Sequence, residues 1–210
     1  MLFVLIVLLL VASVFVLLMK KNRESLCLLG MCCSLMVQFS GILIFIAKKG
    51  GYSRSIINFL FFSQALRNKL QYLFITLDAL GYIIAVGRYL FPLFLLESAL
   101  QYSMIGWIRR HPDIQKWICV LPVATLAVYF PPVFRFIANR WPVMHSVLVE
   151  GSYWWITAYV AVALVLMIQE LFAITMRFCR KQFVGIVGCH LALSGLYLPV
   201  SYTHLRAHET

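Results

Sequence analysis

Residues 81–103, GYIIAVGRYLFPLFLLESALQYS, decide the fold class, because this run is long enough to cross a bilayer and still holds polar residues. Arg88 and Glu97 lie inside the apolar run, and Pro92 lies between them. An ionised side chain at the middle of a membrane costs about 2.5 to 3.5 kcal/mol on insertion scales, so a helix with two of them needs neighbouring helices or water around it. The segment is therefore expected to be a central helix of a bundle.

The composition of the 210-residue chain is that of an integral membrane protein. Hydrophobic residues make up 63% of it and charged residues 12%, whereas soluble domains have about 25% charged residues. The mean hydropathy is +0.92. Apolar runs recur between short charged joints, which favours membrane-spanning helices over a barrel and leaves no room for a separate soluble domain.

The apolar runs predict an all-α bundle with about five complete crossings and a truncated sixth. Four of the five crossings are expected at residues 2–19, 26–47, 116–134 and 153–176, and the sixth begins at residue 183. The remaining one is the central helix, which is contained in residues 72–107, a stretch longer than one crossing. Pro122 is expected to bend the fourth crossing, Pro131 and Pro132 to end it, and residues 135–145 to form an outer loop. The apolar patch within residues 48–70 is too short to span, so it is expected at the outer interface or as a half-helix that folds back.

The basic residues indicate membrane topology rather than nucleic-acid binding. Eighteen Lys and Arg residues stand against seven Asp and Glu residues, for a net charge of +11, but they form small groups at the ends of apolar runs. Lys20, Lys21 and Arg23 follow the first run and no basic residue precedes it, so the N-terminus is expected outside. The six cysteines lie in or beside apolar runs, which is typical of buried packing thiols.

Small residues in the second predicted crossing favour close contact with another helix. Gly30, Ser34, Ser40 and Gly41 lie within it. In membranes such residues let two helix backbones approach each other.

The last twelve residues, 199–210, differ abruptly from what precedes them. Their sequence, PVSYTHLRAHET, resembles the translation of a transposon-end adapter used in sequencing libraries. They are therefore not expected to belong to the native fold, and residues 1–198 are expected to be an incomplete membrane module of a longer protein. On this interpretation His204 and His208, which have the i, i+4 spacing of a metal pair on a helix, carry no meaning.

Five residues are candidates for ligand binding or signal coupling: Asp78, Arg88, Pro92, Glu97 and Glu170. Arg88 and Glu97 are nine residues apart, which places them on opposite sides of a helix at about 100° per residue. We therefore expect Arg88 to contact an acidic group across the bundle, with Asp78 and Glu170 as the candidates. The alternatives are structural polar clamps or carboxylates that reach the inner interface. Pro92 is either a hinge or a fixed kink.

Four aromatic residues are expected at a membrane interface: Trp141, Tyr153, Trp154 and Trp155. The alternative is that they cap an outward-facing ligand cleft together with His145. The histidines before the excluded tail lack metal-ligand spacing, so no metal site is expected. No GxSxG, HExxH or glycine-rich phosphate loop is present in the sequence, so nothing marks a catalytic residue.

Three short stretches carry a family resemblance: GYI at residues 81–83, FPLFLLE at 91–97 and ALQYS at 99–103. They are similar to the Leu-Gly-x-x-x-x-Pro-x-x-x-Leu-x-x-x-Leu-x-Tyr signature of seven-helix input modules. These modules form the multi-pass N-terminal sensing region of bacterial, Firmicutes-type sensor histidine kinases. The resemblance covers most of residues 2–198, and residues 48–70 depart from it by being longer and more basic.

The resemblance implies the input module of a two-component sensor histidine kinase in the bacterial cytoplasmic membrane. A cytoplasmic phosphoacceptor helix and an ATP-binding domain would follow, with ATP and Mg bound only there and no cofactor in this fragment. Such a protein would act as a homodimer, with the lipid bilayer and a response regulator as its partners. Similar modules also precede other outputs, such as a cyclic-nucleotide synthase.

Two function classes remain as alternatives to signal input. A small transporter or channel subunit would use Arg88, Glu97 and Glu170 to line a polar path through the membrane. A membrane-embedded transferase is expected to need clustered charged motifs at one interface, and the sequence has none.

Overall fold

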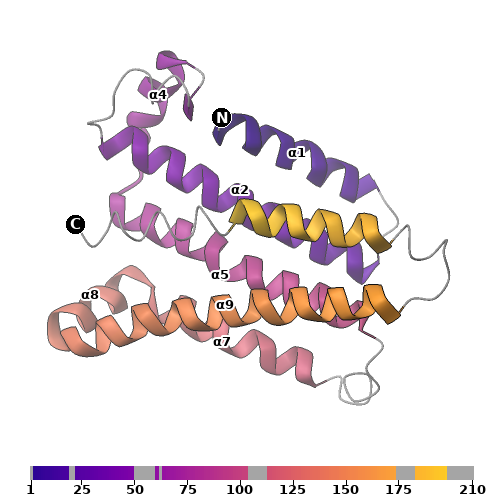
Figure 1. Ribbon diagram of the computed structural model, residues 1–210. Helices are drawn as coiled ribbons and strands as arrows, with labels where there is room; N and C mark the ends of the chain where they lie inside the picture. Colours follow the sequence, from indigo (N-terminus) through magenta and orange to yellow (C-terminus); the bar gives the residue numbers. More distant parts are fainter. Residues whose placement is uncertain are drawn as a thin grey trace.

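The computed structural model is a bundle of α-helices. It describes residues 2–18, 22–49, 60–61, 63–103, 113–173 and 183–197, and these residues include no strand. The long helices lie side by side with roughly aligned axes, and successive ones run in opposite directions, with α5 in the interior of the bundle (Figure 1). The predicted all-α fold class is confirmed.

The helices differ in whether they are long enough to cross a membrane. In chain order they are α1 (Leu2–Leu18), α2 (Arg23–Lys49), α4 (Gln64–Gln71), α5 (Leu77–Tyr102), α7 (Ile114–Val128), α8 (Pro131–Arg140), α9 (Pro142–Ala173) and the helix Phe183–Tyr197. Three of them, α2, α5 and α9, are long and apolar enough to span a membrane. The pair formed by Lys116–Val128 and α8 gives a fourth candidate span, bent by 72°.

The predicted five crossings are not confirmed by the described residues, which hold three candidate spans, or four with the bent pair. The difference lies mainly in two short apolar helices, α1 and Phe183–Tyr197. The 17 residues of α1 reach about 26 Å at 1.5 Å per residue, whereas the hydrocarbon layer is about 30 Å thick.

The predicted outer loop at residues 135–145 is wrong, because this stretch is helical except at Trp141, where α8 ends and α9 has not yet begun. Pro131 and Pro132 lie in the first turn of α8. The N–H groups of a first turn have no acceptor within the helix, so proline, which lacks an N–H, is tolerated there. The two prolines therefore begin a helix after the break at Tyr129 and Phe130. Because α9 already begins at Pro142, its start precedes the predicted boundary by several turns.

The central helix lies within residues 72–107, as predicted, since α5 begins at Leu77 and residues 72–76 precede it. The Thr76 side chain accepts a hydrogen bond from the first turn as the N-cap. Asp78 places a negative charge in that same turn, where the helix dipole favours it. The predicted end at residue 107 lies outside the described residues.

The contact between α2 and α5 is close enough for backbone to meet backbone. A Cβ atom added to Gly87 would lie 2.4 Å from the carbonyl oxygen of Ser34 and 2.7 Å from the backbone nitrogen of Gln38. Added Cβ atoms at Gly30 and Gly41 would each lie 2.7 Å from a side chain of α5. The prediction that small residues of the second crossing make close contacts is confirmed at Gly30, Ser34 and Gly41.

Helix α5 is the central element, as predicted, since α2, α7, α8 and α9 all pack against it. Its buried side chains include Tyr89, Phe91 and Leu95, which belong to the main hydrophobic cluster of the bundle. This position places Arg88, Pro92 and their neighbours inside the protein.

A smaller cluster lies at the far end of α2. Phe61 is fully buried there, packed with Leu43 and Ala47 of α2. The Nζ atom of Lys48 donates a hydrogen bond to the carbonyl oxygen of Leu73, at 2.5 Å. Residues 50–59 and 62, on which part of the prediction for residues 48–70 falls, lie outside the described residues, as do residues 198–210.

Candidate functional site

Arg88 lies near the middle of α5 with only 8% of its surface exposed. Its guanidinium carbon lies 4.6 Å from the ring centroid of Tyr153 on α9 and 5.8 Å from that of Tyr89. A desolvated cation–π contact contributes about 2 kcal/mol, which offsets much of the about 2.5 to 3.5 kcal/mol that arginine costs at the centre of a membrane helix. Aromatic rings therefore stabilise this buried charge.

Two donor atoms of Arg88, Nε and Nη2, have no hydrogen-bond partner within the part of the chain that the structure describes. Buried N–H groups cost free energy until they meet an acceptor, and more so when they carry charge. The guanidinium is therefore suited to hold a water molecule or an anionic group.

The two acidic residues expected to meet Arg88 have other partners. Asp78 forms an ion pair with Arg135 of α8, near the start of α5. Glu170 of α9 is buried and accepts a hydrogen bond from the hydroxyl of Ser103, at 3.4 Å. The ion pairs that the described residues form do not include Arg88, so they do not support the hypothesis of an acidic partner for it.

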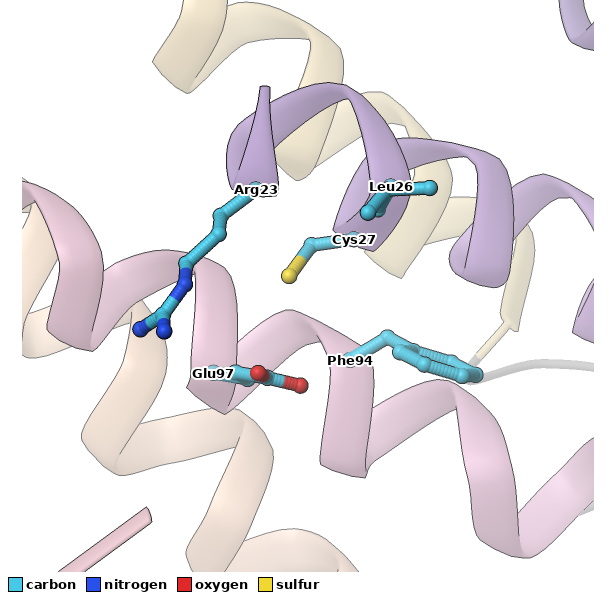
Figure 2. A pocket seen from close by; sticks show the side chains of 5 residues that line it. All are labelled: Arg23, Leu26, Cys27, Phe94 and Glu97. Carbon is cyan, nitrogen blue, oxygen red and sulfur yellow. The ribbon is translucent and has the colours of Figure 1, made fainter. Parts of the chain in front are cut away.

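Glu97 faces a different helix from Arg88. It lines a pocket of about 380 Å³ between α2 and α5. Figure 2 shows Arg23 extending from the first turn of α2 and the thiol of Cys27 pointing into the space that Glu97 also lines. The prediction that Arg88 and Glu97 face different neighbours is confirmed, since Arg88 contacts α9 and Glu97 faces α2.

Arg88 stands at the edge of an aromatic cluster, which we define as Tyr89, Tyr129, Tyr153 and Trp155. The ring of Tyr89 lies 5.1 Å from that of Tyr129 and 5.6 Å from that of Trp155. The hydroxyl groups of Tyr89 and Tyr129 each lie 3.3 Å from Oγ of Ser152. This cluster joins α5, the end of α7 and α9.

Ring contacts continue from the aromatic cluster to α8. Tyr129 stacks on Phe134 with 4.7 Å between ring centroids, and Phe134 lies 4.5 Å from the ring of His145. A further edge-to-face contact joins Tyr82 to Phe130, at 5.7 Å. The bent segment between α7 and α9 is thus connected to Arg88 through packed rings.

Pro92 connects α5 to the helix Phe183–Tyr197. Because proline has no N–H, the carbonyl of Arg88 four residues earlier loses its usual helical partner. The hydroxyl of Tyr197 donates a hydrogen bond to that carbonyl oxygen, at 2.8 Å. The Tyr197 ring also stacks on Phe91, with 4.4 Å between centroids and 18° between planes. The Arg88 carbonyl, which lacks a helical partner because of Pro92, therefore binds the helix Phe183–Tyr197 to α5.

The four predicted interfacial aromatic residues lie in different surroundings. Trp141 and Trp154 are exposed on the bundle, as an interfacial residue requires. Tyr153 contacts Arg88, and Trp155 packs on Tyr89. All three residues at 153–155 lie within α9 rather than at its start.

Sequence analysis missed Tyr197 and Ser152, because their partners are far away in the chain. The bond from Tyr197 to Arg88 spans 109 residues, and that from Tyr89 to Ser152 spans 63. His190 was considered only as a possible metal ligand, and the contact of its Nε2 atom with Oγ of Ser98, at 2.9 Å, was missed. Pro92 was the available signal, since an interior proline leaves a carbonyl that some donor must satisfy.

Metal binding finds no support in the described residues, which hold no group of three or more His, Cys, Asp or Glu side chains placed to bind an ion. No family model matches the chain, and no curated protein or solved structure matches it. Arg88 is the centre of the site. Its buried guanidinium has two N–H donors without a partner among the described residues and lies against the aromatic cluster, and its carbonyl oxygen accepts a hydrogen bond from Tyr197 in the last described helix.

Proposed function

We propose that this chain is the membrane-embedded input module of a signalling protein, with a sensor histidine kinase as the output. One observation carries the proposal: Arg88 contacts both the aromatic cluster, where a signal would enter, and the last described helix, where it would leave. Its guanidinium lies on the aromatic cluster, and its carbonyl oxygen accepts the hydrogen bond from Tyr197. A change at the guanidinium would reach the last described helix through a single residue.

The signal would enter at the bent segment of α7 and α8. A ligand or a change in the envelope that moved α8 would move Phe134, and the contacts of Phe134 with Tyr129 would carry the change to the aromatic cluster. Because packed rings have a few discrete arrangements, a small displacement can select between two of them. The ligand would shift the population towards the arrangement that it binds better.

In this proposal α1 and the helix Phe183–Tyr197 cross the membrane together with the three longer helices and the bent pair. The module would sit in the bacterial cytoplasmic membrane with its N-terminus outside, as a homodimer. Six crossings would return the chain to the outside after Tyr197, so a seventh helix would follow and lead to a cytoplasmic kinase domain. That domain would bind ATP and Mg and pass its phosphoryl group to a response regulator. The apolar character of these helices and the position of Tyr197 support this arrangement.

The complete coding sequence tests the proposal. The full-length protein would be expressed, and inverted membrane vesicles would be incubated with ATP and analysed for phosphohistidine. We expect a reading frame that continues into a phosphoacceptor helix and an ATP-binding domain, with phosphohistidine on the protein. A frame that ends just after the last crossing, with solute flux in proteoliposomes, would instead support a transporter.

A further inference from the structure

Two adjoining pockets follow the groove between α2 and α5. The first, of about 380 Å³, lies beside the first turns of α2 and is lined by Arg23 and Glu97 among others. The second, of about 240 Å³, is almost entirely apolar and is lined by residues that include Val37 and Leu90. Phe94 lines both, so the pockets are neighbours along one groove.

The first pocket presents a positive and a negative side chain to the same space. Arg23 and Glu97 come from different helices and both line it (Figure 2). The ion pairs formed within the described residues do not join these two side chains. A ligand with both a negative and a positive group would therefore find a counter-charge for each.

The length and position of the groove match those of a lipid in one leaflet. Arg23 stands in the first turn of α2, which follows the basic joint after α1, so the first pocket lies where the apolar helix begins. From Arg23 to Val37 the groove extends about 21 Å at 1.5 Å per residue. One leaflet contributes about 15 Å of hydrocarbon, so the second pocket lies at acyl-chain depth.

We propose that this groove binds one phospholipid with a zwitterionic aminophosphate head group. The phosphate would contact the guanidinium of Arg23, and the ammonium would donate hydrogen bonds to the carboxylate of Glu97. One acyl chain would pass over Phe94 into the apolar pocket. An anionic lipid without an amine would satisfy Arg23 but leave Glu97 without a counter-charge, which gives the site a preference among lipids.

Native mass spectrometry of the full chain in detergent micelles tests this site. The protein would be titrated with phosphatidylethanolamine, with phosphatidylglycerol of the same acyl chains and with free phosphoethanolamine. We expect phosphatidylethanolamine to bind about tenfold more tightly than phosphatidylglycerol, which corresponds to about 1.4 kcal/mol. Phosphoethanolamine is expected to bind at least about 100-fold more weakly than the lipid, because it buries no acyl chain.

Two variants separate the roles of the charges. Glu97→Gln keeps the shape of the side chain and is expected to abolish the preference for the amine, without weakening phosphatidylglycerol binding. Arg23→Gln is expected to weaken both lipids. Glu150→Gln and Arg140→Gln change exposed residues outside the groove and serve as matched controls with wild-type binding.

Three results would overturn the proposal. The first is equal binding of the two lipids by the wild-type protein, or tighter binding of phosphatidylglycerol. The second is an unchanged preference in Glu97→Gln. The third is free phosphoethanolamine that binds as tightly as the lipid, which would show a head-group site without a lipid. None of these results bears on the proposed signalling function, which rests on Arg88 and Tyr197.

Discussion

Arg88 contributes two groups to the bundle, and each solves a different physical problem. The guanidinium needs a partner in a buried setting, and the rings of Tyr153 and Tyr89 supply it. The carbonyl needs a donor because Pro92 has none, and Tyr197 supplies it. Both requirements follow from the sequence of α5, whereas Tyr153 and Tyr197 come from other helices.

The contact between Arg88 and Tyr153 predicts a dependence that a double-mutant cycle can measure. Tyr153→Leu in the wild-type background leaves a buried charge without its ring, so we expect it to lower the free energy of unfolding by about 2 kcal/mol. In the Arg88→Leu background the same change should cost much less, because no charge remains. Equal costs in both backgrounds, measured by denaturation in mixed micelles, would show that the ring does not stabilise the cation. Trp154→Leu, at an exposed neighbour, is the control.

The bond from Tyr197 predicts a second dependence. Tyr197→Phe removes the hydroxyl and leaves a buried carbonyl without its donor, so we expect it to cost about 1 kcal/mol of unfolding free energy. Pro92→Ala restores an N–H at residue 92, which can bond to the carbonyl of Arg88. In that background Tyr197→Phe should cost clearly less. A cost that is the same with Pro92 and with alanine would mean that the hydroxyl does not compensate for the proline.

At the scale of the elements, the interface between α2 and α5 depends on the absence of a side chain at Gly87. Gly87→Ala would place a Cβ atom against the backbone of α2. We expect the two helices to separate, at a cost of about 1 to 3 kcal/mol in unfolding free energy. Gly81→Ala in the same helix is the control, since nothing lies within 4 Å of its added Cβ. That change should stabilise the helix by up to about 1 kcal/mol. Equal effects at the two positions would contradict the close approach.

Sequence patterns predicted the helices that follow from one rule, which is that a long apolar run forms a helix. Long apolar runs identified α2, α5 and α9, and the small residues Gly30 and Gly41 indicated the face that α2 turns to α5. The rule failed at residues 131–145, where prolines begin a helix as readily as they end one. Hydropathy also cannot place a helix end within an apolar run, so the start of α9 was missed.

The candidate site was predicted only in part, because its contacts join distant parts of the chain. Composition identified Arg88 and Pro92 as unusual in an apolar helix, and spacing separated Arg88 from Glu97. The sequence does not reveal which acid pairs with which base. Asp78 was expected as a partner for Arg88, yet it pairs with Arg135 across a surface that forms only once α8 bends back.

For the whole molecule, the described helices form one bundle around α5, with a polar pocket at the α2 side and the aromatic cluster at the α9 side. Tyr197 attaches the helix Phe183–Tyr197 to the centre of that bundle rather than to its edge. A helix attached there can respond to the position of α5. This arrangement is the basis for proposing that the chain passes a signal onward.

The most direct test of that proposal is the rate of histidine autophosphorylation of the full-length protein in membrane vesicles, compared between wild type and Tyr197→Phe. Tyr72→Phe, at an exposed tyrosine after α4, is the matched control. We expect Tyr197→Phe to change the rate severalfold while Tyr72→Phe leaves it at the wild-type value. The same rate in all three proteins, or no phosphohistidine in any of them, would contradict a role for the contact between Tyr197 and Arg88 in signalling.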